Sequence, residues 1–205
     1  MIPDLEPATK LPCGSEDLGS GYVLLRAKDE YNQVIYGAQG DAIQEYLEAV
    51  TGVESPDNFQ PSLQRWARLR LPNGQIARSA WKEKQKALNK VRMSRNVWYL
   101  DEAETERYGK IQFLFQAEVE HEIITVALMS PYNSLDEDLF RDSFSTLAVY
   151  HIPEEGQYEV VEVTSISSVV AMVPFDEGRV FAVHKMGLEI CSMAGDVEAD
   201  NEREN

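Results

Sequence analysis

The chain has 205 residues, 43% of them hydrophobic, and a formal net charge of −16. This length suits one substantial core of a soluble globular protein, and no run of eighteen apolar residues predicts a membrane span. Nothing resembles a secretory signal, so we expect an intracellular protein, nuclear or cytoplasmic, in which Cys13 and Cys191 stay reduced. The net negative charge disfavours indiscriminate binding to DNA or anionic lipid at long range.

Residues 1–20 combine proline and glycine with acidic and small residues, which predicts a disordered tail. The apolar run at 22–25 is short and rich in strand formers, so one strand is expected there. Downstream, apolar residues at 43, 46, 47 and 50 follow the spacing of an amphipathic helix. Asp41 is placed to cap the start of this helix and Gly52 to end it.

Two short strand patterns flank Pro72-Asn73-Gly74. Proline presets the first turn position, asparagine tolerates the second, and Gly74 suits a left-handed conformation, so the segment predicts a β-hairpin. Strand alternation then puts Arg68 and Arg70 on one face and the apolar residues between them on the other.

A helix is expected directly after the hairpin, from Ala80 to about Lys90 with Ser79 as its cap. Lys82, Lys86 and Lys90 recur every four residues, which would stack three ammonium groups on one face over about 12 Å. The apolar residues Trp81 and Leu88 would then point inward.

From residue 108 the hydrophobic period changes to two, which predicts a long half-buried strand to 119 followed by a second, more apolar strand at 123–129. A helical turn is expected at 135–140. Four further short strands are predicted at 146–152, 158–164, 168–173 and 179–184. Such closely spaced antiparallel strands usually close into a barrel or pack as a sandwich, which hides their edges.

We therefore expect an α+β protein in four parts. Residues 1–20 form a disordered tail and residues 21–100 a smaller subdomain with the helix and the basic hairpin. Residues 101–194 form an antiparallel β-barrel or sandwich, and residues 195–205 form a disordered acidic tail.

Positive charge is concentrated in one segment. Ten of the nineteen Lys and Arg residues lie between Arg65 and Arg95, opposed only by Glu83, so this segment carries +9 and the rest of the −16 chain carries −25. Cations on one strand face and one helix face, with tryptophans between them, are typical of a phosphate-binding surface, although the tryptophans fit a core better. The predicted nucleic-acid-binding residues are Arg68, Arg70, Arg78, Lys82, Lys86 and Lys90.

Catalytic and metal-binding patterns are missing from the sequence. No nucleophile elbow, phosphate-cradling glycine loop or dinucleotide-binding glycine pattern occurs, and His121, His151 and His184 lack zinc-site spacing. The acidic residues at 136–138 lack the remainder of a calcium loop. We expect no enzyme activity, no cofactor and no metal.

Four stretches together resemble a known group of proteins: GYVLLRA at 21–27, LRLPNGQIARSAW at 69–81, RNV at 95–97 and SISSVVAMVPF at 165–175. They are similar to the C-terminal region of large uncharacterised fungal proteins encoded in or beside transposable elements. The likeness spans roughly residues 20–185 and implies an association with DNA or chromatin. This chain starts just before that region, and so it looks like a free-standing copy of the module.

The layout of the strands from residue 108 onward also resembles bromo-adjacent homology domains, which are small β-rich modules that bind nucleosomes or histone tails. This likeness implies only a similar fold.

The sequence thus favours a non-enzymatic interaction module that presents its basic face to nucleic acid or chromatin. The alternative is a protein-binding or self-associating module whose basic face meets an acidic protein surface. No membrane partner is expected.

Overall fold

A computed structural model of the protein describes residues 11–184 except 57, 92, 102 and 120. This part of the chain is rich in antiparallel sheet and contains few helices, which confirms the α+β class. Cys13 is exposed and its thiol is free, whereas Cys191 lies outside the described residues, as does the predicted tail at 195–205. In the described part, no helix is long and apolar enough to cross a membrane.

The N-terminal half forms two small sheets. The first is four-stranded in the order β1-β2-β5-β6, and the second pairs β3 with β4. Their bounds are β1 Glu16–Gly19, β2 Tyr22–Leu24, β3 Gln33–Val34, β4 Ser62–Leu63, β5 Arg68–Arg70 and β6 Ile76–Arg78. The helices of this half are α1 Ala38–Thr51, α2 Ala80–Glu83 and the short 3-10 helix η1 Leu88–Lys90.

The main sheet has seven strands in the order β10-β13-β12-β7-β8-β9-β11. The strands are β7 Asn96–Leu100, β8 Glu106–Val119, β9 Glu122–Pro131, β10 Val149–His151, β11 Glu159–Glu162, β12 Ile166–Asp176 and β13 Arg179–His184. The helix α3 Glu137–Asp142 follows β9, and the 3-10 helix η2 Val163–Ser165 precedes β12. All six strands predicted from residue 108 onward are therefore present.

The main sheet is open, so of the two predicted arrangements, barrel or sandwich, the closed barrel is not formed. Within the described residues its end strands β10 and β11 do not pair with each other. Helix α1 packs beside β11, where Ile43 of the helix and Val160 of the strand belong to the same apolar cluster. Because α1 covers this end of the sheet, strand-to-strand closure is not needed to shield it.

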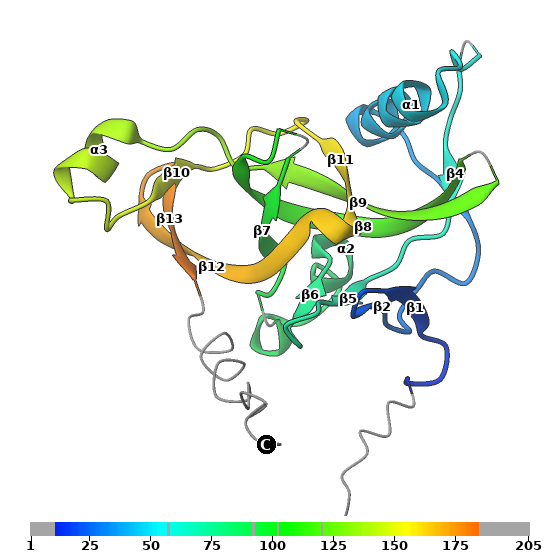
Figure 1. The fold of residues 1–205 in the computed structure, drawn as a ribbon, viewed down its shortest axis with the longest axis horizontal. Helices are drawn as coiled ribbons and strands as arrows, with labels where there is room; N and C mark the ends of the chain where they lie inside the picture. The colour runs from blue at the N-terminus through cyan, green and yellow to red at the C-terminus, as the bar shows by residue number, and fades with distance from the viewer. Residues whose placement is uncertain (1–10, 57, 92, 102, 120, 185–205) are drawn as a thin grey trace, which may run out of the picture.

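Strand β8 is the centre of the fold (Figure 1). The long β8–β9 hairpin crosses the molecule, with α1 on one side and the four-stranded sheet on the other. Its pairing shifts between Ile111 and Phe113, so Gln112 is the extra residue of a β-bulge. The Gln112 amide donates a 2.8 Å hydrogen bond to the Ser130 hydroxyl, which satisfies this buried polar group.

The bulge divides the predicted single core into separate clusters. Ile111 and Leu114 pack with residues of the four-stranded sheet, whereas Phe113 and Phe115 pack with α1. A third cluster, which contains Val170 and Val180, lies between β8, β12 and β13. The expectation of one substantial core is therefore wrong, because β8 is covered on both faces and contributes residues to all three clusters.

Two predicted domain boundaries are also wrong. Residues 16–19, expected in a tail, form β1, whose Leu18 packs against the apolar cluster shared by the four-stranded and seven-stranded sheets. Strand β7, assigned to the subdomain at 21–100, pairs with β8 and β12 in the main sheet. The division at residue 100 therefore cuts through a single sheet.

Helix α1 begins earlier than predicted. Gly37, at φ 62°, precedes its first residue, and Asp41 lies in the first turn rather than at the cap. Gly40 reads in the sequence as a residue before the helix, but it lies inside α1. A side chain does not fit at this position, because a Cβ would approach the Ile35 carbonyl oxygen to 2.7 Å. The predicted end is confirmed, with Gly52 in the left-handed conformation.

Phe113 tests the packing of β8 against α1. It is 2% exposed, so Phe113→Ala is expected to reduce the free energy of unfolding by about 3–5 kcal/mol. Ile123 on β9 is 71% exposed, and Ile123→Ala is the control, with an expected change within about 0.5 kcal/mol. Urea denaturation of both variants measures the difference, and equal losses would contradict the burial described above.

Candidate nucleic-acid interface

The predicted hairpin is confirmed and carries the first half of the basic surface. Leu71 and Gln75 enclose the turn, in which the Gly74 N–H donates to the Leu71 carbonyl at 2.9 Å. Gly74 has φ 79°, as the turn type requires. The turn is held against β12, because the Asn73 amide donates to the Ser167 carbonyl at 3.0 Å and the Gln75 side chain accepts from the Val169 N–H at 2.5 Å.

The hairpin brings two arginines directly opposite each other. Arg68 on β5 pairs in register with Arg78 on β6, and both side chains are half-buried on the face opposite the buried Leu69 and Ala77. Like charges facing each other across a ladder destabilise it. The Arg68 guanidinium donates to the Arg26 carbonyl at 2.6 Å, which fixes its position beside the strand.

The predicted helix after the hairpin is much shorter than expected. The Ser79 hydroxyl accepts from the Lys82 N–H, which confirms the cap, but α2 ends at Glu83 and a separate 3-10 turn covers 88–90. Lys82, Lys86 and Lys90 therefore do not stack on one helix. Lysines at i and i+4 repel one another, and the two large apolar side chains among these eleven residues, Trp81 and Leu88, provide too narrow a face to stabilise the helix.

Four of the six predicted residues nevertheless come together. Arg68, Arg78, Lys82 and Lys86 line one hollow of about 180 Å³, whose lining also includes Ser79 and Glu83. We call these four residues the basic hollow. Arg70 follows on the same strand face, two residues from Arg68, whereas Lys90 lies in η1 and does not line the hollow.

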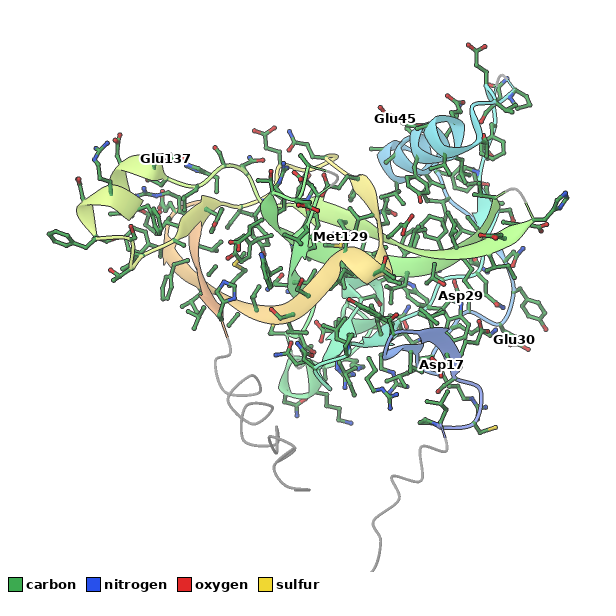
Figure 2. The ribbon with its side chains drawn as sticks, viewed as in Figure 1. Asp17, Asp29, Glu30, Glu45, Met129 and Glu137 are labelled. Carbon is green, nitrogen blue, oxygen red and sulfur yellow. The ribbon has the colours of Figure 1, made fainter. Side chains whose placement is uncertain are left out.

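Arg65 belongs to the basic segment of the sequence but has a structural role. Its Nε lies 2.7 Å from an Asp29 carboxylate oxygen, and its guanidinium lies over the Trp81 ring at 4.3 Å. Asp29 is labelled in Figure 2. The side chains of Arg65 and Asp29 are 22% and 14% exposed, so the pair is partly desolvated. Trp81 is consequently engaged by a cation of its own chain and is not an open stacking platform.

A second positive group lies beside the hollow. Arg95 pairs at 3.5 Å with Glu83, a carboxylate whose side chain is 1% exposed. Burial lowers the pKa of Lys110, and the neighbouring charges of Arg95 and Lys84 lower it further. The cations of this region therefore repel one another, and Glu83 offsets only part of their charge.

Sequence reasoning missed two basic residues that the fold adds to this region. Arg26 and Lys28 follow β2. Lys28 forms an isolated antiparallel β-bridge with Trp66, and its ammonium lies 4.4 Å from the centroid of the Trp66 ring. Lys28 also lies 3.8 Å from Glu16. The sequence signal that could have identified Arg26 and Lys28 is the predicted strand at 22–25. The pairing of this strand with β5 places the residues that follow it beside Arg68.

The histidines and the acidic residues considered as possible metal ligands have local structural roles or are exposed. Asp136 caps α3 and pairs with Arg179 at 2.7 Å, so its carboxylate is already engaged. His184 lies 2.7 Å from the Tyr108 hydroxyl, and His121 and His151 are exposed. Among the described residues, no group of three or more acidic, histidine or cysteine side chains could hold a metal ion.

Comparison with family models, with curated proteins and with solved structures finds no match to this chain.

Arg65 and Arg70 allow structural cations to be separated from surface cations. Arg65→Ala removes a charge-assisted hydrogen bond and leaves Asp29 without its partner, so we expect a loss of roughly 1.5–3 kcal/mol in the free energy of unfolding. Arg70→Ala is the matched control, because no partner of its side chain occurs among the described residues, and its expected change is within about 0.5 kcal/mol. Chemical denaturation of both variants provides the measurement; a larger loss for Arg70→Ala would contradict this assignment.

Proposed function

We propose that this protein is a non-enzymatic interaction module that presents the basic hollow, extended by Arg70, to the phosphates of nucleic acid or chromatin. The observation that carries the proposal is the convergence of Arg68, Arg78, Lys82 and Lys86 on one hollow from a hairpin, a short helix and the turn that follows this helix. Two of the four are arginines, whose planar guanidinium groups match the geometry of a phosphate.

Electrostatics support a local interaction despite the net charge of −16. The screening length at physiological salt is about 8 Å, so a ligand in contact with the hollow responds mainly to the nearest charges. A bound phosphate would also offset the like charges of Arg68 and Arg78, which face each other across the ladder. The resemblance of residues 20–185 to transposon-associated fungal proteins favours the same partner and a site of action within the cell.

A salt titration of binding to duplex and single-stranded DNA tests the proposal. For duplex DNA, each phosphate contact contributes roughly 0.9 to the slope of log affinity against log salt. Reversal of Lys82 and Lys86 to Glu is expected to reduce the magnitude of this slope by the contribution of roughly two phosphate contacts. The reversal should also weaken binding to all sequences alike.

Arg141→Glu provides the charge-matched control for each single reversal. Arg141 lies on α3, far from the hairpin, with its side chain 72% exposed, and its reversal changes the net charge as much as Lys82→Glu does. The control should leave the salt slope unchanged. Absence of binding at low salt, or equal effects of Lys82→Glu and Arg141→Glu, would reject nucleic acid and favour an acidic protein surface as the partner.

A further inference from the structure

A second candidate site lies at the other end of the main sheet, under α3. A cleft of about 700 Å³ opens between the start of β8, the segment after β9, α3 and β10. Figure 1 shows α3 and β10 at this end, away from the basic hairpin. The walls of the cleft include Glu106, Tyr108, Tyr132, Asn133, Phe140 and Tyr150.

Four aromatic side chains border the cleft. The rings of Tyr108 and Tyr150 are 4.8 Å apart and tilted by 45°, and Tyr132 follows directly after β9. The Tyr132 hydroxyl donates to Asn96 at 3.1 Å, and the Tyr108 hydroxyl lies 2.7 Å from the ring of His184. Tyr108 and Tyr132 are buried in the cluster that contains Val170 and Val180, so the aromatic surface left to a ligand is that of the half-buried Tyr150 and Phe140.

The tyrosines stay neutral at physiological pH. Burial raises the pKa of Tyr132 to about 12. Burial also raises the pKa of Tyr108, and the neighbouring Tyr150 and Glu106 raise it further. The negative charge beside the cleft therefore comes from carboxylate and not from phenolate.

Glu106 is that carboxylate. It lies two residues before Tyr108 on β8, on the same face of the strand, and its side chain is exposed. In the described residues no ion pair involves Glu106. Arg107 also borders the cleft, but its guanidinium lies 3.6 Å from Asp101, with which it pairs. An unpaired carboxylate beside aromatic rings is complementary to a cation that has a flat apolar surface.

We propose that this cleft binds an arginine side chain of a basic partner peptide. A guanidinium stacks on aromatic rings and presents five N–H donors in one plane, so it can contact Glu106 and the polar groups of Asn133 and Ser134 together. An ammonium is a more strongly hydrated point charge, and a quaternary ammonium has no donor for the carboxylate. Phosphate-bearing ligands are repelled by Glu106.

The charge distribution supports a basic partner at this end of the molecule. The chain outside residues 65–95 carries −25, so the net field of the molecule attracts a positively charged peptide. The cleft volume is larger than one side chain requires, which leaves room for the residues that flank the arginine. This inference does not depend on nucleic-acid binding, because it uses different residues and the opposite charge.

The test uses the full-length protein and four capped tripeptides with Gly-Arg-Gly, Gly-citrulline-Gly, Gly-Lys-Gly and Gly-trimethyllysine-Gly sequences, titrated by calorimetry and by NMR of the labelled protein. Citrulline keeps the shape of arginine and removes its charge. We expect the arginine peptide to bind at least about tenfold more tightly than the citrulline peptide, the size of one charge-assisted hydrogen bond. The shifted NMR signals should include Tyr150 and Phe140.

Glu106→Gln should reduce affinity for the arginine peptide by about tenfold, whereas Glu45→Gln should leave it unchanged. Both glutamates are exposed, and Glu45 lies on α1, as Figure 2 shows. Near-UV circular dichroism checks that the aromatic cluster is intact in each variant. Equal binding of arginine and citrulline, tighter binding of trimethyllysine, an unaffected Glu106→Gln variant, or no binding would each overturn the proposal.

Discussion

The extra residue in β8 is the feature on which the rest of the structure depends. By shifting the pairing at Gln112, it turns Ile111 and Leu114 toward the four-stranded sheet and leaves Phe113 and Phe115 facing α1. Leu114 and Trp66 exchange two backbone hydrogen bonds, at 2.7 and 3.1 Å, just beyond the point where β7 stops pairing with β8. The segment that leads into the basic hairpin is thereby attached to β8, and this attachment fixes the position of the hairpin relative to the core.

Local patterns predicted much of this architecture, because alternation and turn residues act over a few positions. The hairpin at 72–74, the end of α1 at Gly52 and the six strands from residue 108 are all where the sequence places them. Closure of the sheet was not predictable in this way, since it depends on where α1 packs. The same applies to β1: its four residues have weak strand character, and only pairing with β2 and the burial of Leu18 make them a strand.

For the candidate site, charge periodicity identified four residues that line the hollow, but it predicted the wrong secondary structure for the segment that carries the lysines. Repetition of lysine every four residues suggested a helix, yet like charges at this spacing destabilise a helix. The hollow forms instead because Ser79 starts a single helical turn directly after β6, so Lys82 and Lys86 return toward Arg68 and Arg78. Conversely, the sequence did not distinguish Arg65 and Arg95 from the other basic residues of this segment. Their structural roles depend on ion pairs formed in the fold, Arg65 with Asp29 and Arg95 with Glu83.

The hairpin turn contains the dipeptide Asn73-Gly74, a sequence prone to deamidation because glycine leaves the following backbone nitrogen accessible to the asparagine side chain. Here that nitrogen donates to Leu71, and the Asn73 amide is held between the Ser167 carbonyl and the Gln75 N–H. These contacts oppose formation of the cyclic intermediate in the folded state. Deamidation after local unfolding would replace the amide donor of Asn73 with a carboxylate facing the Ser167 carbonyl. The attachment of the hairpin to β12 would therefore weaken as deamidated molecules accumulate over time.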